Sequence, residues 1–124
     1  ISEIGWSNIY FMPLLHANKS LSSIKVLHWH QDRIKLPKGS KLIAYSELCR
    51  EQFFSYGDKI LGLQFHLETT KSILESWLSE DIEFIKNGLG DNGLEIIKSQ
   101  TISNYSKNEN ERIDLIRYLF SQLT

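Results

Sequence analysis

The order of hydrophobic and polar positions divides the chain into a first half of strands and a second half of helices. Runs rich in β-branched and aromatic residues, bounded by turn-forming residues, predict five strands. They cover Ile4–Met12, which Pro13 closes, and then Ser23–His30, Lys41–Glu47, Gln52–Gly57 and Lys59–His66. The last run is almost continuously apolar, which is typical of a strand covered on both faces in an α/β sheet.

From Thr70 onward the hydrophobic residues recur every three or four positions, which predicts helices. An amphipathic helix is expected from Thr70 to Asn87, with Thr69 or Thr70 as its N-cap and Gly88 as its stop. A short helix is expected over Leu94–Ser103. A final helix within Asn108–Thr124 is expected to bury Ile113, Leu115 or Ile116, Leu119 and Phe120.

Composition narrows the class of protein. A chain of 124 residues with 41% hydrophobic content suits one globular domain. The 14 Lys and Arg residues balance 15 Asp and Glu residues, so neither nucleic acid nor an anionic membrane surface is an expected partner. A single cysteine, Cys49, excludes an internal disulfide framework and favours a reducing compartment, so we expect a cytoplasmic protein.

The stretch LGLQFHLETT contains the first candidate chemistry. In an extended chain, side chains alternate between two faces, so Gln64, His66 and Glu68 are expected to share one face. A carboxylate beside an imidazole holds the ring in one orientation and stabilises its charged form. The pair supplies a general base and the group that orients it, but a nucleophile is also needed.

Cys49 is the first candidate for that nucleophile, and its surroundings disfavour it. A catalytic thiol needs an exposed sharp turn or a helix N-terminus, yet no glycine flanks Cys49 and its neighbours include Glu47 and Glu51. We expect Cys49 to be a small buried hydrophobic residue. A serine elbow of the G-x-S-x-G type does not occur in the sequence.

Histidines raise the alternative of a metal-binding domain. His28 and His30 lie two positions apart, and with His66 they offer imidazole ligands of the kind that zinc and iron take. An H-x-H pair of the cupin type needs a glutamate a few residues later, and the residues after His30 do not supply one. We therefore assign no metal from the sequence.

Several motifs taken in order resemble one family. EIGW is followed by VLHWHQDRIKLP, and the chain then reaches LGLQFHLE. The pattern H-x-D-x-x-x-L-P of His30, Asp32, Leu36 and Pro37, with the closing Gln64, Phe65, His66 and Glu68, resembles the C-terminal half of class I glutamine amidotransferase domains. The resemblance extends from Val26 to Glu68 and is closest to γ-glutamyl peptidases and to stand-alone proteins similar to the glutaminase part of GMP synthetase.

The resemblance implies a flavodoxin-like α/β fold in which strands of a mixed sheet are followed by helices. It also implies hydrolysis of a glutamine side-chain amide or a γ-glutamyl bond through a cysteine thioester, without a cofactor. By position, His66 is then the general base and Glu68 orients it. His30 and Gln31 are expected near the α-amino and carboxylate end of the glutamyl group.

The sequence departs from the family pattern in two places. Leu67 stands where the family has a proline between the histidine and the glutamate, so the backbone is freer there. The family's nucleophile lies in the N-terminal half of the domain, which residues 1–124 do not resemble.

We therefore expect this chain to be the C-terminal part of one domain, inactive alone and completed by its N-terminal half or by a self-associating copy. The alternative is a non-catalytic remnant that serves as a binding or dimerisation module.

Overall fold

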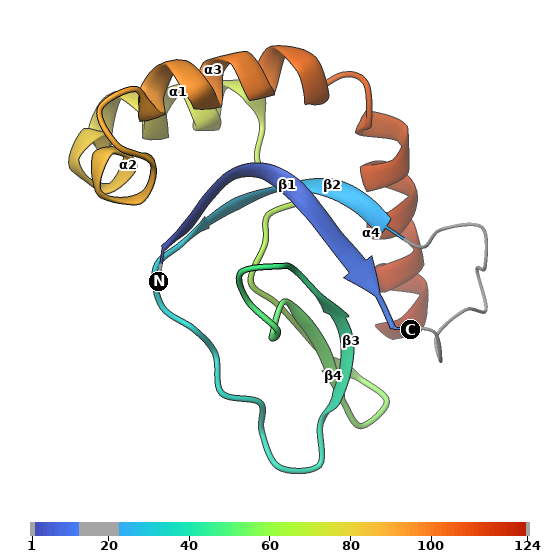
Figure 1. Cartoon of the computed structure of the whole chain (residues 1–124). Helices are drawn as coiled ribbons and strands as arrows, with labels where there is room; N and C mark the ends of the chain where they lie inside the picture. Colours follow the sequence, from blue (N-terminus) through green and yellow to red (C-terminus); the bar gives the residue numbers. More distant parts are fainter. Residues whose placement is uncertain (1, 13–22, 124) are drawn as a thin grey trace.

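The computed structural model describes residues 2–12 and 23–123, and within them a sheet precedes a group of helices (Figure 1). The strands are β1 (Glu3–Phe11), β2 (Ser23–His30), β3 (Lys41–Tyr45), β4 (Phe53–Tyr56) and β5 (Ile60–Leu63). The helices are α1 (Lys71–Glu80), α2 (Ile82–Leu89), α3 (Gly93–Asn104) and α4 (Glu109–Leu123). The α/β class and the order of strands before helices are confirmed, whereas Pro13 lies outside the described residues.

The sheet has the strand order β2-β1-β3-β4-β5, and each of these described pairings is antiparallel. β1 and β2 pair over most of their length, from Glu3 opposite His30 to Tyr10 opposite Ser23. β1 meets β3 only at its end, through Tyr10 and Phe11. The start of β1 therefore diverges from β3, and Figure 1 shows it passing away from the β3–β4 pair.

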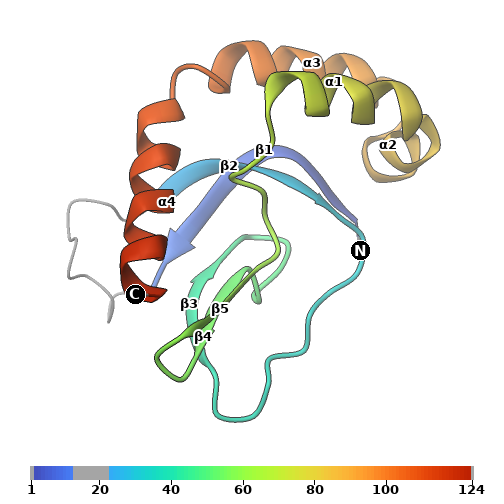
Figure 2. The same cartoon turned by 180° about the vertical axis from the view of Figure 1, so that it is seen from behind.

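Two hydrophobic clusters cover opposite faces of the β1–β2 pair, because successive side chains of a strand alternate. One cluster contains Ile9, Ile24, Val26, Ala44, Phe53, Phe65, Leu115 and Leu119. The other contains Ile4, Trp6, Leu27, Leu74, Leu78, Ile85 and Ile97. Helix α4 thus packs on one face and α1, α2 and α3 on the other, an arrangement visible from behind in Figure 2.

The single helix expected from Thr70 to Asn87 is wrong, because two helices meet at Asp81. Asp81 leaves helical geometry at φ −107° and ψ 40°. The break turns α2 so that Ile85 reaches the same cluster as Leu74 and Leu78. Asp81 is a poor helix former, but no proline or glycine marks the break in the sequence.

Gly88 was expected to end this helical segment, but it lies inside α2, which ends at Leu89 with Gly90 as its C-cap at φ 87°. A Cβ atom on Gly88 would lie 2.9 Å from Cγ2 of Ile4. The glycine therefore serves close packing of α2 against β1. Only the left-handed backbone at Gly90 marks the helix end.

The buried face of α4 was predicted only in part. Leu115 and Leu119 are buried as expected, whereas Phe120 is 66% exposed. Arg112 is instead buried, with its guanidinium over the ring of Trp6 and its nitrogens donating to the carbonyls of Asn104 and Tyr105. A cation held this way joins α4 to α3 and β1.

The predicted strand Lys59–His66 ends early, at Leu63. β5 is also the last strand of the described sheet, and Ile60 is 56% exposed, so the expectation of a strand covered on both faces is wrong. The turn before β5 is as expected: Gly57 adopts φ 66°, which the Gly-Asp pair permits. No helix among the described residues is long and apolar enough to cross a membrane.

Replacing Thr70 with alanine should lower the free energy of unfolding by about 1 kcal/mol. The Thr70 side chain accepts a hydrogen bond from the backbone N–H of Ile73 at 3.2 Å and caps α1, as predicted. Urea unfolding measures the change. Ser79→Ala, at an exposed serine of the same helix, is the matched control, and equal losses in both variants would contradict a capping role for Thr70.

Candidate functional site

His66 and Glu68 form a hydrogen-bonded pair. Nδ1 of His66 lies 2.9 Å from Oε2 and 3.3 Å from Oε1 of Glu68. A carboxylate can only accept, so Nδ1 is the donor and Nε2 is left with a lone pair in the neutral ring. The predicted pairing of these two side chains is therefore present in the geometry, with Leu67 between them.

Contacts of the neighbouring residues hold the pair in place. The backbone N–H of His66 donates to the carbonyl of Leu27 at 2.9 Å, which ties this segment to β2. Phe65 is buried in the cluster under α4, and Leu67 packs against the same cluster. Because Phe65 and Leu67 point to one side, His66 is directed to the other.

Helix α1 supplies an aromatic wall for the imidazole. The ring of Trp77 meets the ring of His66 edge-on, with centroids 5.1 Å apart, and Trp77 in turn packs against Trp29. The His66 side chain keeps 27% of its surface exposed and Glu68 keeps 68%. The ring is thus held firmly but can still be reached by another group.

Glu68 is charged in this setting. Partial burial raises the pKa of Glu68, but hydrogen bonds from its own backbone N–H, from His66 and from Thr69 outweigh burial and hold the pKa below its usual value. The carboxylate therefore remains ionised at neutral pH and is able to stabilise a positive charge on the imidazole.

Gln64 does not share this site. The expected alternation fails because β5 has ended at Leu63. The side-chain amide of Gln64 donates to the Glu51 carbonyl at 2.6 Å and to the Cys49 sulfur at 3.4 Å. Gln64 therefore fastens the loop that carries Cys49 and Glu51.

Cys49 is buried, at 6% exposure, in agreement with the expectation of a small buried residue. Among the described residues, its sulfur contacts Gln64 and, at 4.0 Å, Oε1 of Glu51. His66 is not among these contacts. The described geometry therefore gives Cys49 no imidazole base to activate it.

His30 is the last residue of β2, Gln31 follows it, and the two side chains differ in their surroundings. Nδ1 of His30 lies 3.1 Å from the Asp32 carbonyl, and Nε2 lies 3.1 Å from Oε1 of Glu3. Gln31 is exposed. No direct contact joins His30 to His66 among the described residues, so the two pairs of predicted site residues are separate groups.

Glu3 is the residue that the sequence analysis missed. It is only 4% exposed, and it accepts hydrogen bonds from Ser46 Oγ at 2.7 Å and from the amide of Gln52. Burial raises the pKa of Glu3, but the hydrogen bond with His30, the attraction of His28 and the Ser46 hydroxyl outweigh it and lower the pKa. The only signal in the sequence was that Glu3 directly precedes the predicted strand Ile4–Met12, while its position opposite His30 is seen in the structure.

His28 lies on the same face of β2 and is fully buried, at 0% exposure. Burial lowers the pKa of His28 to about 4, although the charge of Glu3 raises it. His28 is therefore neutral at ordinary pH.

Comparison with known proteins identifies relatives of this sequence. Over 53 residues, 42% of this chain, the sequence is 40% identical to γ-glutamyl peptidase 5 of Arabidopsis thaliana. Over 86 residues, 69% of the chain, it is 27% identical to a glutamine amidotransferase-like protein of Salmonella typhimurium. No protein-family profile matches the chain.

Solved structures decide the fold. A glutamine amidotransferase of Methylobacillus flagellatus matches 98% of this chain with a TM-score of 0.75 at 20% identity. One of Thermotoga maritima also matches 98%, with a TM-score of 0.73 at 23% identity. The chain has a glutamine amidotransferase fold. The expected flavodoxin-like α/β class of these enzymes is thereby confirmed.

This glutamine amidotransferase-like chain is shorter than the proteins that it resembles. It covers 51% and 50% of the two solved amidotransferases. Its matched segments cover 21% of the Arabidopsis peptidase and 36% of the Salmonella protein.

Proposed function

We propose that the chain supplies the base-bearing part of a cysteine-dependent amide hydrolase that acts on glutamine or a γ-glutamyl bond. The observation that carries the proposal is the hydrogen bond between His66 Nδ1 and Glu68. Similarity to a γ-glutamyl peptidase and to glutamine amidotransferase-like proteins supports the substrate class.

In the proposed reaction, Nε2 of His66 removes the proton of a cysteine thiol from the N-terminal half of the domain. The thiolate attacks the amide carbon, and the imidazolium then protonates the departing ammonia or amine. Water hydrolyses the thioester with Nε2 again acting as the base. Glu68 keeps Nδ1 protonated throughout and stabilises the imidazolium.

His30 and Gln31 are proposed at the glutamyl end of the substrate. Since both ring nitrogens of His30 contact groups of the chain itself, the ring holds the shape of the loop, and the exposed amide of Gln31 is free to bind the α-amino or carboxylate group. An amide suits both groups because it donates and accepts hydrogen bonds.

The test compares the complete protein with the segment 1–124 in an ammonia-release assay with glutamine and with a γ-glutamyl peptide. The complete protein should turn over at least one of the two substrates, and the segment alone should turn over neither, because it lacks a positioned thiolate. Activity should return when the N-terminal half is added to the segment.

Cys49→Ser in the complete protein is the matched control and should keep full activity, because Cys49 is buried and its sulfur contacts Gln64 and Glu51 rather than His66. Loss of activity in Cys49→Ser would assign the thiol to this chain and overturn the proposal. A complete protein that is inactive on both substrates would instead favour a non-catalytic binding or dimerisation module.

A further inference from the structure

Three potential metal ligands converge on one side of the β1–β2 pair. They are Glu3 from β1 and His28 and His30 from β2, and the ligand atoms that they offer all lie within 4.8 Å of one another. Oε1 of Glu3 is 3.1 Å from Nε2 of His30 and 3.7 Å from Nδ1 of His28. The two-residue spacing of the histidines puts both rings on the face that Glu3 occupies.

In a neutral His30 ring, the hydrogen bond to Asp32 leaves the nitrogen that faces Glu3 without a proton. The Asp32 carbonyl can only accept, so Nδ1 of His30 carries the proton that points to it. In the neutral ring, Nε2 then presents a lone pair to Oε1 of Glu3, which is also an acceptor. At 3.1 Å the contact is favourable only if Nε2 is protonated and donates to Glu3, or if a metal cation lies between the two atoms.

His28 has unsatisfied ring nitrogens as well. The residue is fully buried, and no hydrogen bond of normal geometry reaches Nδ1 or Nε2 among the described residues, with only the Ser7 backbone near the ring. Oε1 of the adjacent Gln52 is also buried without a donor. Buried polar atoms normally have partners, because leaving one unsatisfied costs about 1–3 kcal/mol.

We propose that Glu3, His28 and His30 bind a divalent transition-metal cation of the zinc class. Two imidazole nitrogens and one carboxylate oxygen are a ligand set that zinc takes readily. A cation at their centre would satisfy the lone pairs of both rings at once. His66, which the sequence also offered as a ligand, is paired with Glu68 and is not part of this cluster.

The spacing agrees with the size of such a site. Bonds of about 2.0–2.2 Å at tetrahedral angles put neighbouring ligand atoms about 3.3 Å apart. The distances of 3.1 and 3.7 Å from Glu3 to the two rings bracket that value. The full set of ligand atoms lies within 4.8 Å, so the widest separation has to close by side-chain movement when the coordination sphere forms.

An outer shell of hydrogen bonds already orients two of the three ligands, Glu3 and His30. The Asp32 carbonyl fixes the ring of His30, while Ser46 and Gln52 donate to the carboxylate oxygens of Glu3. Ligands of metal sites are commonly oriented this way. These partners leave one lone pair of each proposed ligand for the cation.

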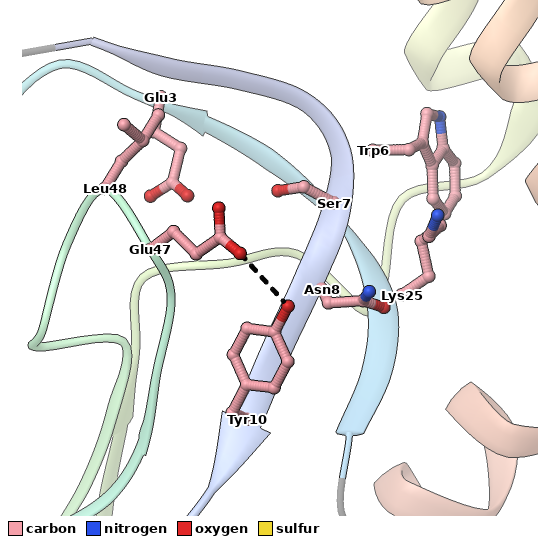
Figure 3. Close-up of a pocket in the computed structure, with 8 residues that line it drawn as sticks. All are labelled: Glu3, Trp6, Ser7, Asn8, Tyr10, Lys25, Glu47 and Leu48. Carbon is pink, nitrogen blue, oxygen red and sulfur yellow. Dashed lines mark hydrogen bonds between the residues drawn. The ribbon is translucent and has the colours of Figure 1, made fainter.

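A pocket beside Glu3 provides an approach to the cluster. Its volume is about 280 Å³, and it lies between β1 and the loop that carries Glu47 and Leu48. Figure 3 shows the carboxylates of Glu3 and Glu47 in this pocket, with Lys25 near its other end. Two carboxylates against one ammonium favour entry of a cation.

The experiment measures zinc in the complete protein, prepared without a polyhistidine tag, by elemental analysis after dialysis. We expect one equivalent of zinc per chain, and Co²⁺ should give a saturable visible absorption band. Ser46→Ala should weaken zinc binding about 10- to 100-fold, and removal of a ligand in Glu3→Gln or His30→Gln should weaken it further.

His66→Ala is the control, because it removes a histidine outside the cluster and should retain zinc. Circular dichroism identifies any variant that does not fold, and His30, whose side chain is 12% exposed against 5% for Glu3, offers a milder change. Absence of zinc together with absence of a cobalt band would overturn the proposal and leave a shared proton between Glu3 and His30. Zinc content equal to the parent in folded His30→Gln would also overturn it.

Discussion

Replacing His66 with alanine should lower the rate of ammonia release by the complete protein about 10²- to 10⁴-fold. The imidazole is the proposed group that removes a proton from the thiol and returns one to the leaving group, and water replaces it poorly in both steps. The loss should fall on kcat, because the substrate is expected to bind through Gln31 and not through His66. Steady-state kinetics at saturating substrate measure this loss.

Glu68→Gln separates the orienting role from simple removal of a charge. The amide can donate to Nδ1 and favour the wrong tautomer of His66, so kcat should fall although the size of the side chain is preserved. Glu75→Gln makes the same chemical change at an exposed position of α1 and should leave kcat unaltered. Parent-like activity in His66→Ala, or equal effects of the two glutamine variants, would refute the assigned roles.

The pair of His66 and Glu68 was predictable because its partners are close in the sequence. The strand in which it was placed ends at Leu63, and yet the pairing survives. Phe65 and Leu67 still turn inward to the core, and this local alternation alone sends His66 outward. A short apolar-polar pattern can therefore specify a side-chain pair without specifying the length of the strand.

The surroundings of Glu3, by contrast, were not predictable from neighbouring residues in the sequence. Its partners Ser46 and Gln52 lie 43 and 49 positions away, and the hydrogen bonds form because β1 diverges from β3 and leaves room for a buried carboxylate. No pattern of neighbouring residues in the sequence predicts such a divergence of two strands. The predicted strand began at Ile4 and did not include Glu3, and the register of Glu3 opposite His30 is known only from the structure.

Helix α4 shows why periodicity alone misplaces a buried face. Phe120 fits the hydrophobic spacing and is exposed, whereas Arg112 breaks it and is buried. The guanidinium is stabilised by the ring of Trp6 and by two carbonyls at the end of α3. These partners come from distant segments, so a pattern confined to α4 does not contain them.

Replacing Phe53 with alanine should lower the free energy of unfolding by about 3–5 kcal/mol. Phe53 is 1% exposed, and its ring meets that of Phe65 edge-on at 6.2 Å. Truncation removes the buried ring and leaves a cavity that strands β3 and β5, paired on either side, can close only in part. Urea unfolding of the complete protein measures the change.

Tyr56→Ala is the matched control, because Tyr56 belongs to the same strand and is 45% exposed. Its effect should remain within about 0.5 kcal/mol, as is usual for surface positions. Phe65 directly precedes His66, so a collapse of this core also displaces the imidazole, and Phe53→Ala should reduce kcat where Tyr56→Ala does not. Similar losses of stability in the two variants would show that β4 does not bury Phe53 against Phe65, and the proposed support of His66 by this core would then fail.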